Sequence, residues 1–528
     1  MAKTTSRLLP IVVAAGLALA GARNVSAGDV SEGLSMAPGA RTQTLSIEKL
    51  RGLLWAGRTS SVQTVARFEA AIAAGDHAGP DLHTVIALNP RVADEARAMD
   101  AARRPREAAA PLDGVPILIK DNIDVDDGLA TTAGSLALKD NVTGRDAPVV
   151  ARLKAAGALI LGKTNLSEWA NFRSTGSVSG WSGVGGQTRN AVDPRRSPCG
   201  SSSGSAAAVA AGFAAAAVGT ETDGSITCPA AVNGVVGLKP TVGLVSRTHI
   251  VPISNTQDTA GPIALTVRDA AILLTAIAGT DPTDPATREA DARKSDYSTK
   301  LDSGALRGAR IGVMRFAAGF HPATDVVFEA ALARLKAAGA VLVEIKDGPD
   351  RKALGAAERK VLLTEFKVGV EAYLATTSPE RVPTRTLADL IAFNRAHAAE
   401  EMPLFGQELF EASEKTTGLA DPDYLAALAT ARRLAGVEGI DRMLARNGVV
   451  ALVAPTMGPA CLIDPVLKDQ FVGGGTGQMA AVAGYPHLTV PMGEVSGLPV
   501  GLSFVGPAWS EATLLAFGYA FEQTRNPS

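Results

Sequence analysis

The sequence has few cysteines, no excess of positive charge and no long apolar run after its N-terminus. Its 528 residues include only Cys199, Cys228 and Cys461, so at most one intramolecular bridge can form and a disulfide-stabilised scaffold is excluded. Lys and Arg number 51 against 53 Asp and Glu, which leaves no overall excess from which a nucleic-acid-binding face could be built. With 46% hydrophobic and 20% charged residues, the composition is that of an ordinary soluble globular protein.

The N-terminus has the features of a secretory signal peptide. Lys3 and Arg7 precede an apolar core at residues 8–20, and the small residues V-S-A complete a signal peptide of residues 1–27. This core is shorter than the ~20 residues that a transmembrane anchor needs. We therefore expect an exported protein, periplasmic or secreted, whose residues 28–528 form one domain without stable membrane insertion.

A stretch rich in Ser, Gly and Ala carries the clearest chemical signal. A Ser- and Gly-dense loop at residues 200–205 precedes an Ala-rich apolar run at residues 206–218, which predicts a buried helix, and a D-G-S turn follows at residues 223–225. Glycine lets the backbone approach a ligand closely, and serine supplies a nucleophile or a proton relay. A flexible linker of similar composition would not enclose so apolar a helix. The stretch therefore predicts a catalytic serine site.

A lysine follows a short apolar run near residue 120. The segment V-P-I-L-I at residues 115–119 predicts a buried strand that Lys120 ends. Burial would lower the pKa of this lysine and make a neutral amine available as a base. The alternative is a surface lysine whose stem covers apolar neighbours. The later pair Lys163-Thr164 lacks the upstream glycine of a phosphate-binding loop.

The segment G-S-S-S-G at residues 200–204 also matches the G-x-S-x-G nucleophile elbow. That interpretation makes Ser202 the nucleophile of an α/β-hydrolase and requires an acidic residue and then a histidine downstream. It also requires a strand before the motif, and the prolines within residues 193–198 break one. The elbow interpretation is therefore disfavoured.

Hydrophobic patterns over the rest of the chain predict alternating helices and strands. Ser61 is expected to cap the second helix of an N-terminal helical layer. Helices are expected within residues 45–104, 148–156, 323–338 and 358–445, and strands at residues 158–161, 310–313, 341–345, 449–454, 488–490 and 498–505. Because predicted strands come from both ends of the chain, we expect an α/β fold: a single α/β/α domain with a large mixed central β-sheet.

Several of these motifs together resemble the amidase signature family of Ser-Ser-Lys amide hydrolases. The family hallmarks G-G-S-S-G-G-S and G-T-D-T-G-G-S-I-R-x-P-A are similar to C-G-S-S-S-G-S at residues 199–205 and G-T-E-T-D-G-S-I-T-C-P-A at residues 219–230. The likeness extends to P-L-D-G-V-P-I-L-I-K-D-N-I-D at residues 111–124 and to A-G-Y-P-H-L-T-V-P near the C-terminus. Within the family, it is greatest to the bacterial peptide amidases, which cleave C-terminal carboxamides.

The resemblance implies a role for each matching residue. Ser225 would be the nucleophile, Ser201 the bridging serine that a cis peptide usually holds, and Lys120 the base. No cofactor, no metal and none of the six histidines would take part. The oxyanion would be held by backbone N–H groups of Thr222, Asp223, Gly224 and Ser225.

Several positions depart from the family pattern. Glu221 and Asp223 replace an Asp and a Gly, and Cys199 and Ser203 each replace a Gly. The Asp223 carboxylate could orient the NH2 group of a substrate or repel a carboxylate product; alternatively, it points outward and caps the turn. Cys199 and Cys228 flank the predicted site, and both a bridge and a reduced buried pair are compatible with the sequence. A cysteine nucleophile is a third alternative, which the lack of a histidine nearby in the sequence disfavours.

The predicted function is hydrolysis of the C-terminal carboxamide of peptides through an acyl-serine intermediate. An amidase for small aryl, aliphatic or amino-acid amides is the first alternative. The ammonia-generating subunit of a tRNA amidotransferase is a second, which the signal peptide disfavours. An exported binding protein without turnover is a third, which the intact Lys and Ser residues disfavour. The expected partner is a small-molecule or peptide amide, with no nucleic acid, and a monomer is favoured.

Overall fold

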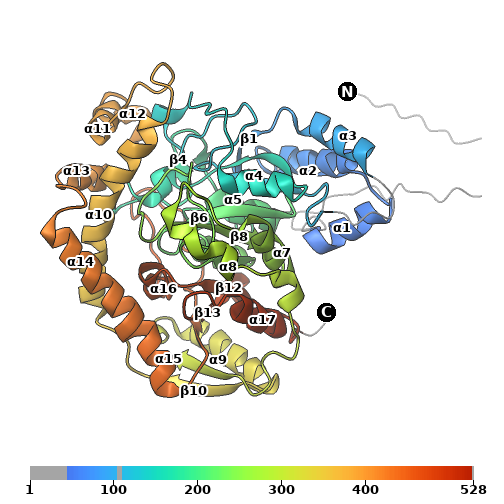
Figure 1. The fold of residues 1–528 in the computed structure, drawn as a ribbon, viewed down its shortest axis with the longest axis vertical. Helices are drawn as coiled ribbons and strands as arrows, with labels where there is room; N and C mark the ends of the chain where they lie inside the picture. The colour runs from blue at the N-terminus through green and yellow to red at the C-terminus, as the bar shows by residue number, and fades with distance from the viewer. Residues whose placement is uncertain (1–43, 104–109, 526–528) are drawn as a thin grey trace, which may run out of the picture. The chain divides into compact units, whose positions relative to one another are not determined.

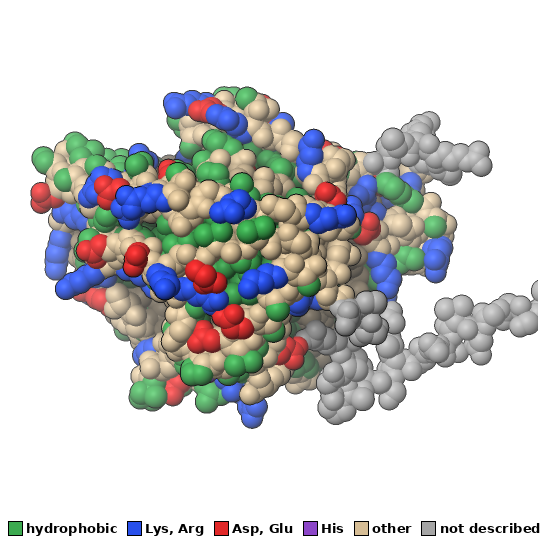
Figure 2. Space-filling model, turned by 90° about the horizontal axis from the view of Figure 1, so that it is seen from below, with side chains coloured by type: hydrophobic (Ala, Val, Ile, Leu, Met, Phe, Trp, Pro, Cys, Tyr) green, Lys and Arg blue, Asp and Glu red, His purple; other side chains and the backbone are tan. Residues whose placement is uncertain are grey.

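The computed structural model describes residues 44–103 and 110–525, all within one compact unit. The predicted signal peptide, residues 1–27, lies outside the described residues. Among the helices that the structure describes, none is both long and apolar enough to cross a membrane. On the face shown in Figure 2, basic and acidic side chains are interspersed with apolar ones.

Eleven strands form one mixed sheet, to which both ends of the chain contribute (Figure 1). Strands β3, β2 and β6 run parallel near one edge and β11, β9 and β10 near the other, while the pairs between them are antiparallel. In sheet order the strands are β1 (Val85–Leu88), β3 (Leu159–Thr164), β2 (Pro116–Lys120), β6 (Ala216–Glu221), β8 (Thr259–Ala264), β7 (Val236–Lys239), β12 (His487–Val495), β13 (Leu498–Val505), β11 (Ala451–Pro455), β9 (Arg310–Met314) and β10 (Val341–Ile345). This arrangement confirms the predicted α/β fold with a large mixed sheet.

Helices surround the sheet, and a separate two-stranded ribbon pairs β4 (Trp181–Ser182) with β5 (Gly186–Gln187). A π-helical segment, Arg433–Asp441, joins α14 to α15. The α-helices are α1 (Ile47–Trp55), α2 (Ser61–Gly75), α3 (Val92–Ala102), α4 (Pro148–Ala155), α5 (Ser203–Ala211), α6 (Thr227–Asn233), α7 (Val267–Ile277), α8 (Ala290–Arg293), α9 (Pro322–Ala337), α10 (Arg351–Ala375), α11 (Leu387–Ala396), α12 (Ala398–Glu401), α13 (Glu408–Glu414), α14 (Pro422–Arg432), α15 (Arg442–Asn447), α16 (Gly477–Ala483) and α17 (Glu511–Glu522).

Alternation along β12 shows how helices cover both faces of the sheet. Leu488 and Val490 lie against Gly518 of α17, whereas Thr489 between them lies near Gly501 on the side of α6. Successive side chains of a strand point to opposite faces, so α17 and α6 lie on opposite sides of the sheet. Helix α5 packs against α6 and against β2, β3, β6 and β8. The loops that enter α5 and α6 therefore meet on one face of the sheet.

The Ala-rich run at residues 206–218 does not form the single helix that its composition predicts. Helix α5 ends at Ala211, Gly212 takes a left-handed conformation (φ 78°), and strand β6 begins at Ala216. Buried alanine offers no polar face, so neither the helical nor the strand period can be read from the pattern. A left-handed glycine commonly ends a helix, so Gly212 is the one residue of this run that indicates the change from helix to strand.

Two smaller expectations about the N-terminal layer were also wrong. Ser60, rather than Ser61, caps α2, because its side chain accepts the N–H of Gln63 at 3.1 Å. Strand β1 lies within the segment predicted to be helical, paired with β3 at the sheet edge. Its four residues are too short a run for periodicity to separate a strand from a helix.

Gly204, in the first turn of α5, is packed too tightly for any side chain. An added Cβ would lie 2.3 Å from the Thr84 carbonyl oxygen and 2.6 Å from that of Asn165, both backbone atoms. We expect Gly204→Ala to lower the free energy of unfolding by about 1–3 kcal/mol, measured by chemical denaturation. The control is Gly52→Ala in α1, where no atom lies within 4 Å and the free energy should rise by about 0.5–1 kcal/mol. A Gly204→Ala protein as stable as the parent would contradict this packing.

Candidate active site

Lys120, the last residue of β2, has a fully buried side chain. Its Nζ lies 2.7 Å from Ser201 Oγ, 2.8 Å from Thr220 Oγ1 and 3.3 Å from the Thr220 carbonyl oxygen. All of these oxygens are uncharged, so no carboxylate of the described residues pairs directly with the amine. Burial lowers the pKa of Lys120 to about 7, although the charges of Asp258 and Glu221 oppose the shift. The amine is therefore partly neutral at neutral pH.

Ser201 lies in the loop that leads from Cys199 into α5, and the Gly200–Ser201 peptide bond is cis. Its side chain is buried, and its carbonyl oxygen accepts the Ser167 N–H at 3.1 Å. A Cβ on Gly200 would lie 2.2 Å from Ser167 Oγ, so only glycine fits there. This packing holds the Ser201 hydroxyl beside Lys120.

Ser225 lies in the turn between β6 and α6 and is 7% exposed. Its carbonyl oxygen accepts the Ser202 N–H at 3.0 Å, which joins this turn to the Ser201 loop. Beneath the turn, the buried Glu221 carboxylate accepts the N–H groups of Ile226 at 2.8 Å and Thr227 at 2.9 Å. The turn is therefore fixed from two sides.

The backbone N–H groups of this turn are unoccupied. Among the described residues, none accepts a hydrogen bond from the N–H of any residue from 222 to 225. Gly224 takes a left-handed conformation (φ 78°), which L side chains rarely adopt. Four consecutive free donors next to a serine form a site suited to a developing negative charge.

Ser202 does not have the environment that the nucleophile-elbow interpretation requires. Its hydroxyl donates to the Thr220 carbonyl oxygen at 3.0 Å and accepts the Thr220 N–H at 3.2 Å. No described histidine is among its partners, and no strand leads into Gly200. The buried His487 instead lies 2.6 Å from Ser503 Oγ. Lys163, the other lysine considered from the sequence, pairs with Asp121 at 2.8 Å.

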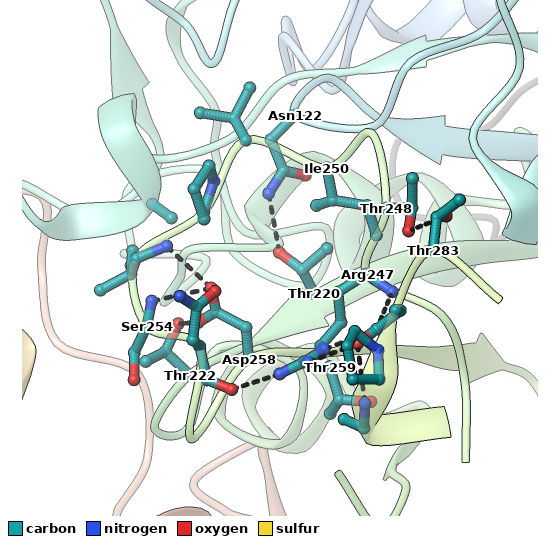
Figure 3. A pocket seen from close by; sticks show the side chains of 18 residues that line it. Asn122, Thr220, Thr222, Arg247, Thr248, Ile250, Ser254, Asp258, Thr259 and Thr283 are labelled. Carbon is teal, nitrogen blue, oxygen red and sulfur yellow. Dashed lines mark hydrogen bonds and ion pairs between the residues drawn. The ribbon is translucent and has the colours of Figure 1, made fainter. Parts of the chain in front are cut away.

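Two cavities border the turn. The first, of about 420 Å³, is lined by side chains that include Asn122, Thr220, Thr222 and Asp258 (Figure 3). The second, of about 320 Å³, is lined in part by Asp223 and Gly224. A ligand can therefore approach the turn from either side.

Sequence reasoning missed the residues that hold the site from a distance. The Thr222 hydroxyl donates to Asp258 at 2.6 Å, and burial raises the pKa of Asp258 to about 6. Asn122 donates to Thr220 Oγ1 at 3.0 Å, beside the Lys120 amine. Asn122 and Thr220 stand within the quoted motifs and could have been found there, whereas no pattern marks Asp258. Within the described part of the chain, no group of three or more His, Cys, Asp or Glu is placed to hold a metal.

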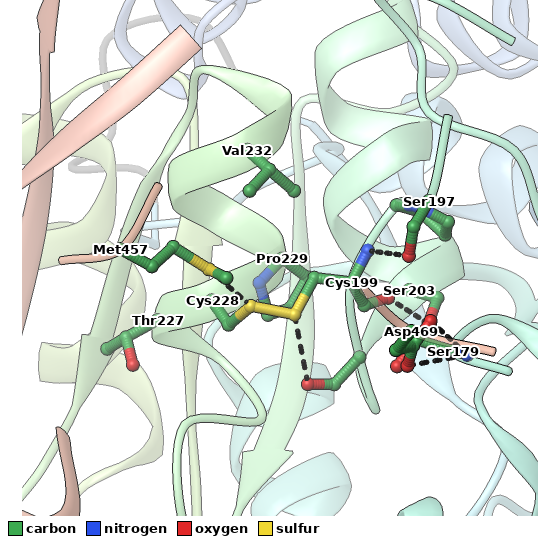
Figure 4. The surroundings of a disulfide bond; sticks show 12 residues. Ser179, Ser197, Cys199, Ser203, Thr227, Cys228, Pro229, Val232, Met457 and Asp469 are labelled. Atoms are coloured by element: carbon green, nitrogen blue, oxygen red, sulfur yellow. Dashed lines mark hydrogen bonds between the residues drawn. A yellow bond between two sulfur atoms is a disulfide. The ribbon is translucent and has the colours of Figure 1, made fainter. Parts of the chain in front are cut away.

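A disulfide joins Cys199 to Cys228, with the two Cα atoms 6.0 Å apart (Figure 4). Met457 packs against the Cys228 sulfur. The bridge links the residue before Gly200 to the first turn of α6, so it connects the two serine loops covalently. It answers a question that the sequence left open, and Cys461 remains a free thiol.

Comparison with known proteins identifies the fold as that of an amide hydrolase. The chain belongs to the amidase family, whose model, Amidase, matches residues 67–515. It is thus an enzyme that hydrolyses amide C–N bonds, and the resemblance read from its motifs is confirmed.

Several relatives are similar to this chain over most of its length. The native peptide amidase from Stenotrophomonas maltophilia is 52% identical, with a TM-score of 0.87 over 91% of this chain and 97% of that one. A peptide amidase in complex with the competitive inhibitor chymostatin is 53% identical, with a TM-score of 0.88 over the same shares. A probable amidase of Arabidopsis thaliana is 38% identical over 491 residues, 91% of this chain and 90% of the relative.

The disulfide should contribute strongly to stability because it closes a loop across 29 positions of sequence. The chain-entropy model gives about 3–4 kcal/mol for such a loop, and we expect Cys199→Ser with Cys228→Ser to lower the free energy of unfolding by about this amount. Thiol reduction should destabilise the wild type equally and leave the double variant unchanged. Cys461→Ser is the control and should behave as wild type. A wild-type melting temperature that reductant does not move would contradict the prediction.

Proposed function

We propose that this amidase removes the C-terminal carboxamide of peptides, giving the free acid and ammonia, with Lys120, Ser201 and Ser225 as its catalytic residues. The observation that carries the proposal is the 2.7 Å contact between the buried Lys120 amine and the Ser201 hydroxyl. The hydrogen bond from Ser202 to the Ser225 carbonyl ties the nucleophile's turn to the same loop. A base, a relay and a nucleophile are thus supplied by three adjoining elements.

In the proposed mechanism, neutral Lys120 accepts the Ser201 proton while Ser201 accepts the proton of Ser225. Ser225 Oγ then attacks the carbonyl carbon of the amide. As the C–N bond breaks, the relay runs in reverse and protonates the departing nitrogen, which leaves as ammonia. Water, activated by the same relay, hydrolyses the acyl ester on Ser225 and restores the enzyme.

The free N–H groups at residues 222–225 would hold the oxyanion in both tetrahedral intermediates. Removing one well-placed donor of this kind typically costs about 3–4 kcal/mol of transition-state stabilisation. Glu221 keeps the donors in place by binding the next two N–H groups of the chain. Such preorganisation means that little reorganisation is needed when charge develops.

The peptide substrate is supported by similarity to solved peptide amidases at 52–53% identity over 91% of the chain. Small aryl, aliphatic or amino-acid amides are the alternative substrates of the same machinery. We also propose that residues 1–27 are removed on export, so that an amidase domain of residues 28–528 acts in the periplasm or outside the cell. Mass analysis of the secreted protein's N-terminus would test that cleavage.

A substrate panel tests both the reaction and the residues. Purified mature protein is given a C-terminally amidated peptide, the matching amino-acid amide and an aryl amide, and ammonia and product mass are measured. We expect the peptide amide to react fastest, with internal bonds intact. Ser225→Ala should lose about 10⁴–10⁶-fold in kcat, because nucleophile and relay act as a unit. Ser202→Ala, the neighbouring control, should retain most of its activity.

The outcomes of the panel separate the alternatives. Turnover of small amides alone would remove the peptide substrate and keep the catalytic residues. A wild type silent on all three amides would favour the binding protein. Loss of activity in Ser202→Ala but not in Ser225→Ala would restore the nucleophile elbow.

The pH dependence of kcat/KM should report the Lys120 amine. Below a pKa of about 7 the amine is protonated and cannot accept a proton, so kcat/KM should fall roughly tenfold per pH unit on the acid side. The Asp258 charge favours the protonated amine, so Asp258→Asn should move the midpoint to lower pH. A flat profile between pH 5.5 and 8.5 would count against Lys120 as the base.

A further inference from the structure

Asp223 presents an unpartnered carboxylate to the cavity beside the nucleophile. Its side chain is exposed where it lines the 320 Å³ cavity together with Gly224, Thr227 and Gln478. It makes no hydrogen bond or ion pair with any residue that the structure describes. Ser225 lies between Gly224 and Thr227 in the chain, and both of these residues line the same cavity as Asp223. A carboxylate this close to the chemistry and without a protein donor is available to substrate.

The other carboxylates near Asp223 are already occupied. Glu358 of α10 accepts hydrogen bonds from Gln257 at 3.0 Å and Gln478 at 2.8 Å. Glu221 of β6 accepts, through one carboxylate oxygen, the N–H groups of Ile226 and Thr227, which follow the turn. Neither group gives Asp223 a donor. Of the three, Asp223 alone has both oxygens free to meet a ligand.

The charges around Asp223 favour a ligand that brings hydrogen-bond donors. Although Asp223 is open to the cavity, the protein atoms packed around the cavity wall desolvate its carboxylate, and this desolvation, followed by the charges of Glu358 and Glu221, raises the pKa of Asp223 well above its usual value. The cations Lys239 of β7 and Arg351 of α10, the second of which lines the same cavity, oppose that shift. An ionised carboxylate beside two others is unfavourable unless a donor reaches it. An arriving N–H group would supply that donor.

A C-terminal carboxamide and a C-terminal carboxylate differ in whether they can donate a hydrogen bond to Asp223. A carboxamide offers one acceptor oxygen and an NH2 group with two donors, whereas a carboxylate offers acceptors alone and carries a negative charge. When the carbonyl oxygen lies against the free N–H groups of residues 222–225, the NH2 group lies close to the same turn, because both are bonded to one carbon. Asp223 is the turn residue with a free acceptor.

We propose that Asp223 accepts a hydrogen bond from the NH2 group of the substrate's carboxamide and repels the carboxylate of the acid product. The inference rests on the proposed amidase function and deepens it. Asp223 thereby selects amidated over free C-termini and speeds product release. It is a specificity-determining residue and takes no part in the proton relay.

The test uses the unreactive Ser225→Ala protein, so that both ligands can be measured by titration calorimetry. The ligands are an N-acetylated dipeptide amide and the matching dipeptide acid; if only small amides react in the substrate panel, such an amide and its acid replace them. We expect the amide to bind about ten- to hundredfold more tightly than the acid. Adding Asp223→Asn should reduce this ratio at least tenfold, chiefly by tightening acid binding.

The control is Glu358→Gln, a nearby acid-to-amide change at a carboxylate that does not line the cavity. It should change the amide-to-acid ratio less than about threefold, because its oxygens serve protein donors. In the Ser225→Ala protein the ratio should grow as pH rises and Asp223 loses its proton, and with Asp223→Asn this pH dependence should vanish. A general loss of structure would weaken both ligands together and leave the ratio unchanged.

Two results would overturn the inference: equal binding of amide and acid, or a ratio that Asp223→Asn leaves intact. Either result is compatible with full amidase activity of the wild type, so it would leave the proposed function standing. A wild type that turns over no amide would instead remove the proposed function, and this inference with it. Unfolding midpoints of each variant establish that the compared proteins are folded.

Discussion

The site depends on one constraint: the Lys120 amine is fully buried without a carboxylate in contact with it. The adjacent strand provides a contrast, because Lys163 is equally buried but pairs with Asp121 at 2.8 Å. A direct ion pair would favour the ammonium and remove its value as a base. Neutral oxygens from Thr220 and Ser201 instead satisfy the amine in either protonation state. Lys120 and Lys163 are equally buried, so they differ in their partners. Lys163 contacts a carboxylate, whereas Lys120 contacts uncharged oxygens and is therefore suited to act as a base.

The carboxylates around the site are used to hold backbone rather than to neutralise Lys120. Glu221 binds the N–H groups of Ile226 and Thr227, directly after the turn that carries Ser225. Asp258 binds the N–H groups of Ile253 and Ser254 and the Thr222 hydroxyl. Because these groups fix the turn by contacts at its two ends, its own N–H donors remain free for a substrate oxygen. Fixed dipoles of this kind stabilise charge without rearrangement, which is the main source of catalysis in acyl transfer.

Individual strands could be predicted from the sequence, because a strand's hydrophobic pattern lies within a few neighbouring residues. The run at residues 498–505 was predicted with the bounds that β13 has, and Lys120 was placed at the end of a buried strand, as found. The contact of Lys120 with Ser201 spans 81 positions and could be expected only through the family motifs. No sequence pattern indicates Asp258 or Glu358, because their hydrogen-bond partners lie in segments that are distant in the sequence. The disulfide was undecidable for the same reason, since only the fold brings two cysteines together.

Asp223 stands where the amidase signature pattern has Gly, and the proposed substrate offers a physical reason for this difference. A peptide amide and its acid differ only in an NH2 group replaced by a charged oxygen, so apolar packing cannot separate them. A site that hydrogen-bonds a polar group rejects an analogue lacking it far more strongly than a shape-based pocket does, because the site's own polar group is then left unpaired. A glycine at residue 223 has no polar side chain that an acid ligand could leave without a hydrogen bond. An acid ligand would also bring a second negative charge to the cavity that Asp223 lines, which makes that penalty larger. In the role that we propose for Asp223, the unpaired carboxylate destabilises the empty site, and the binding of an amide, but not of the acid, relieves that cost.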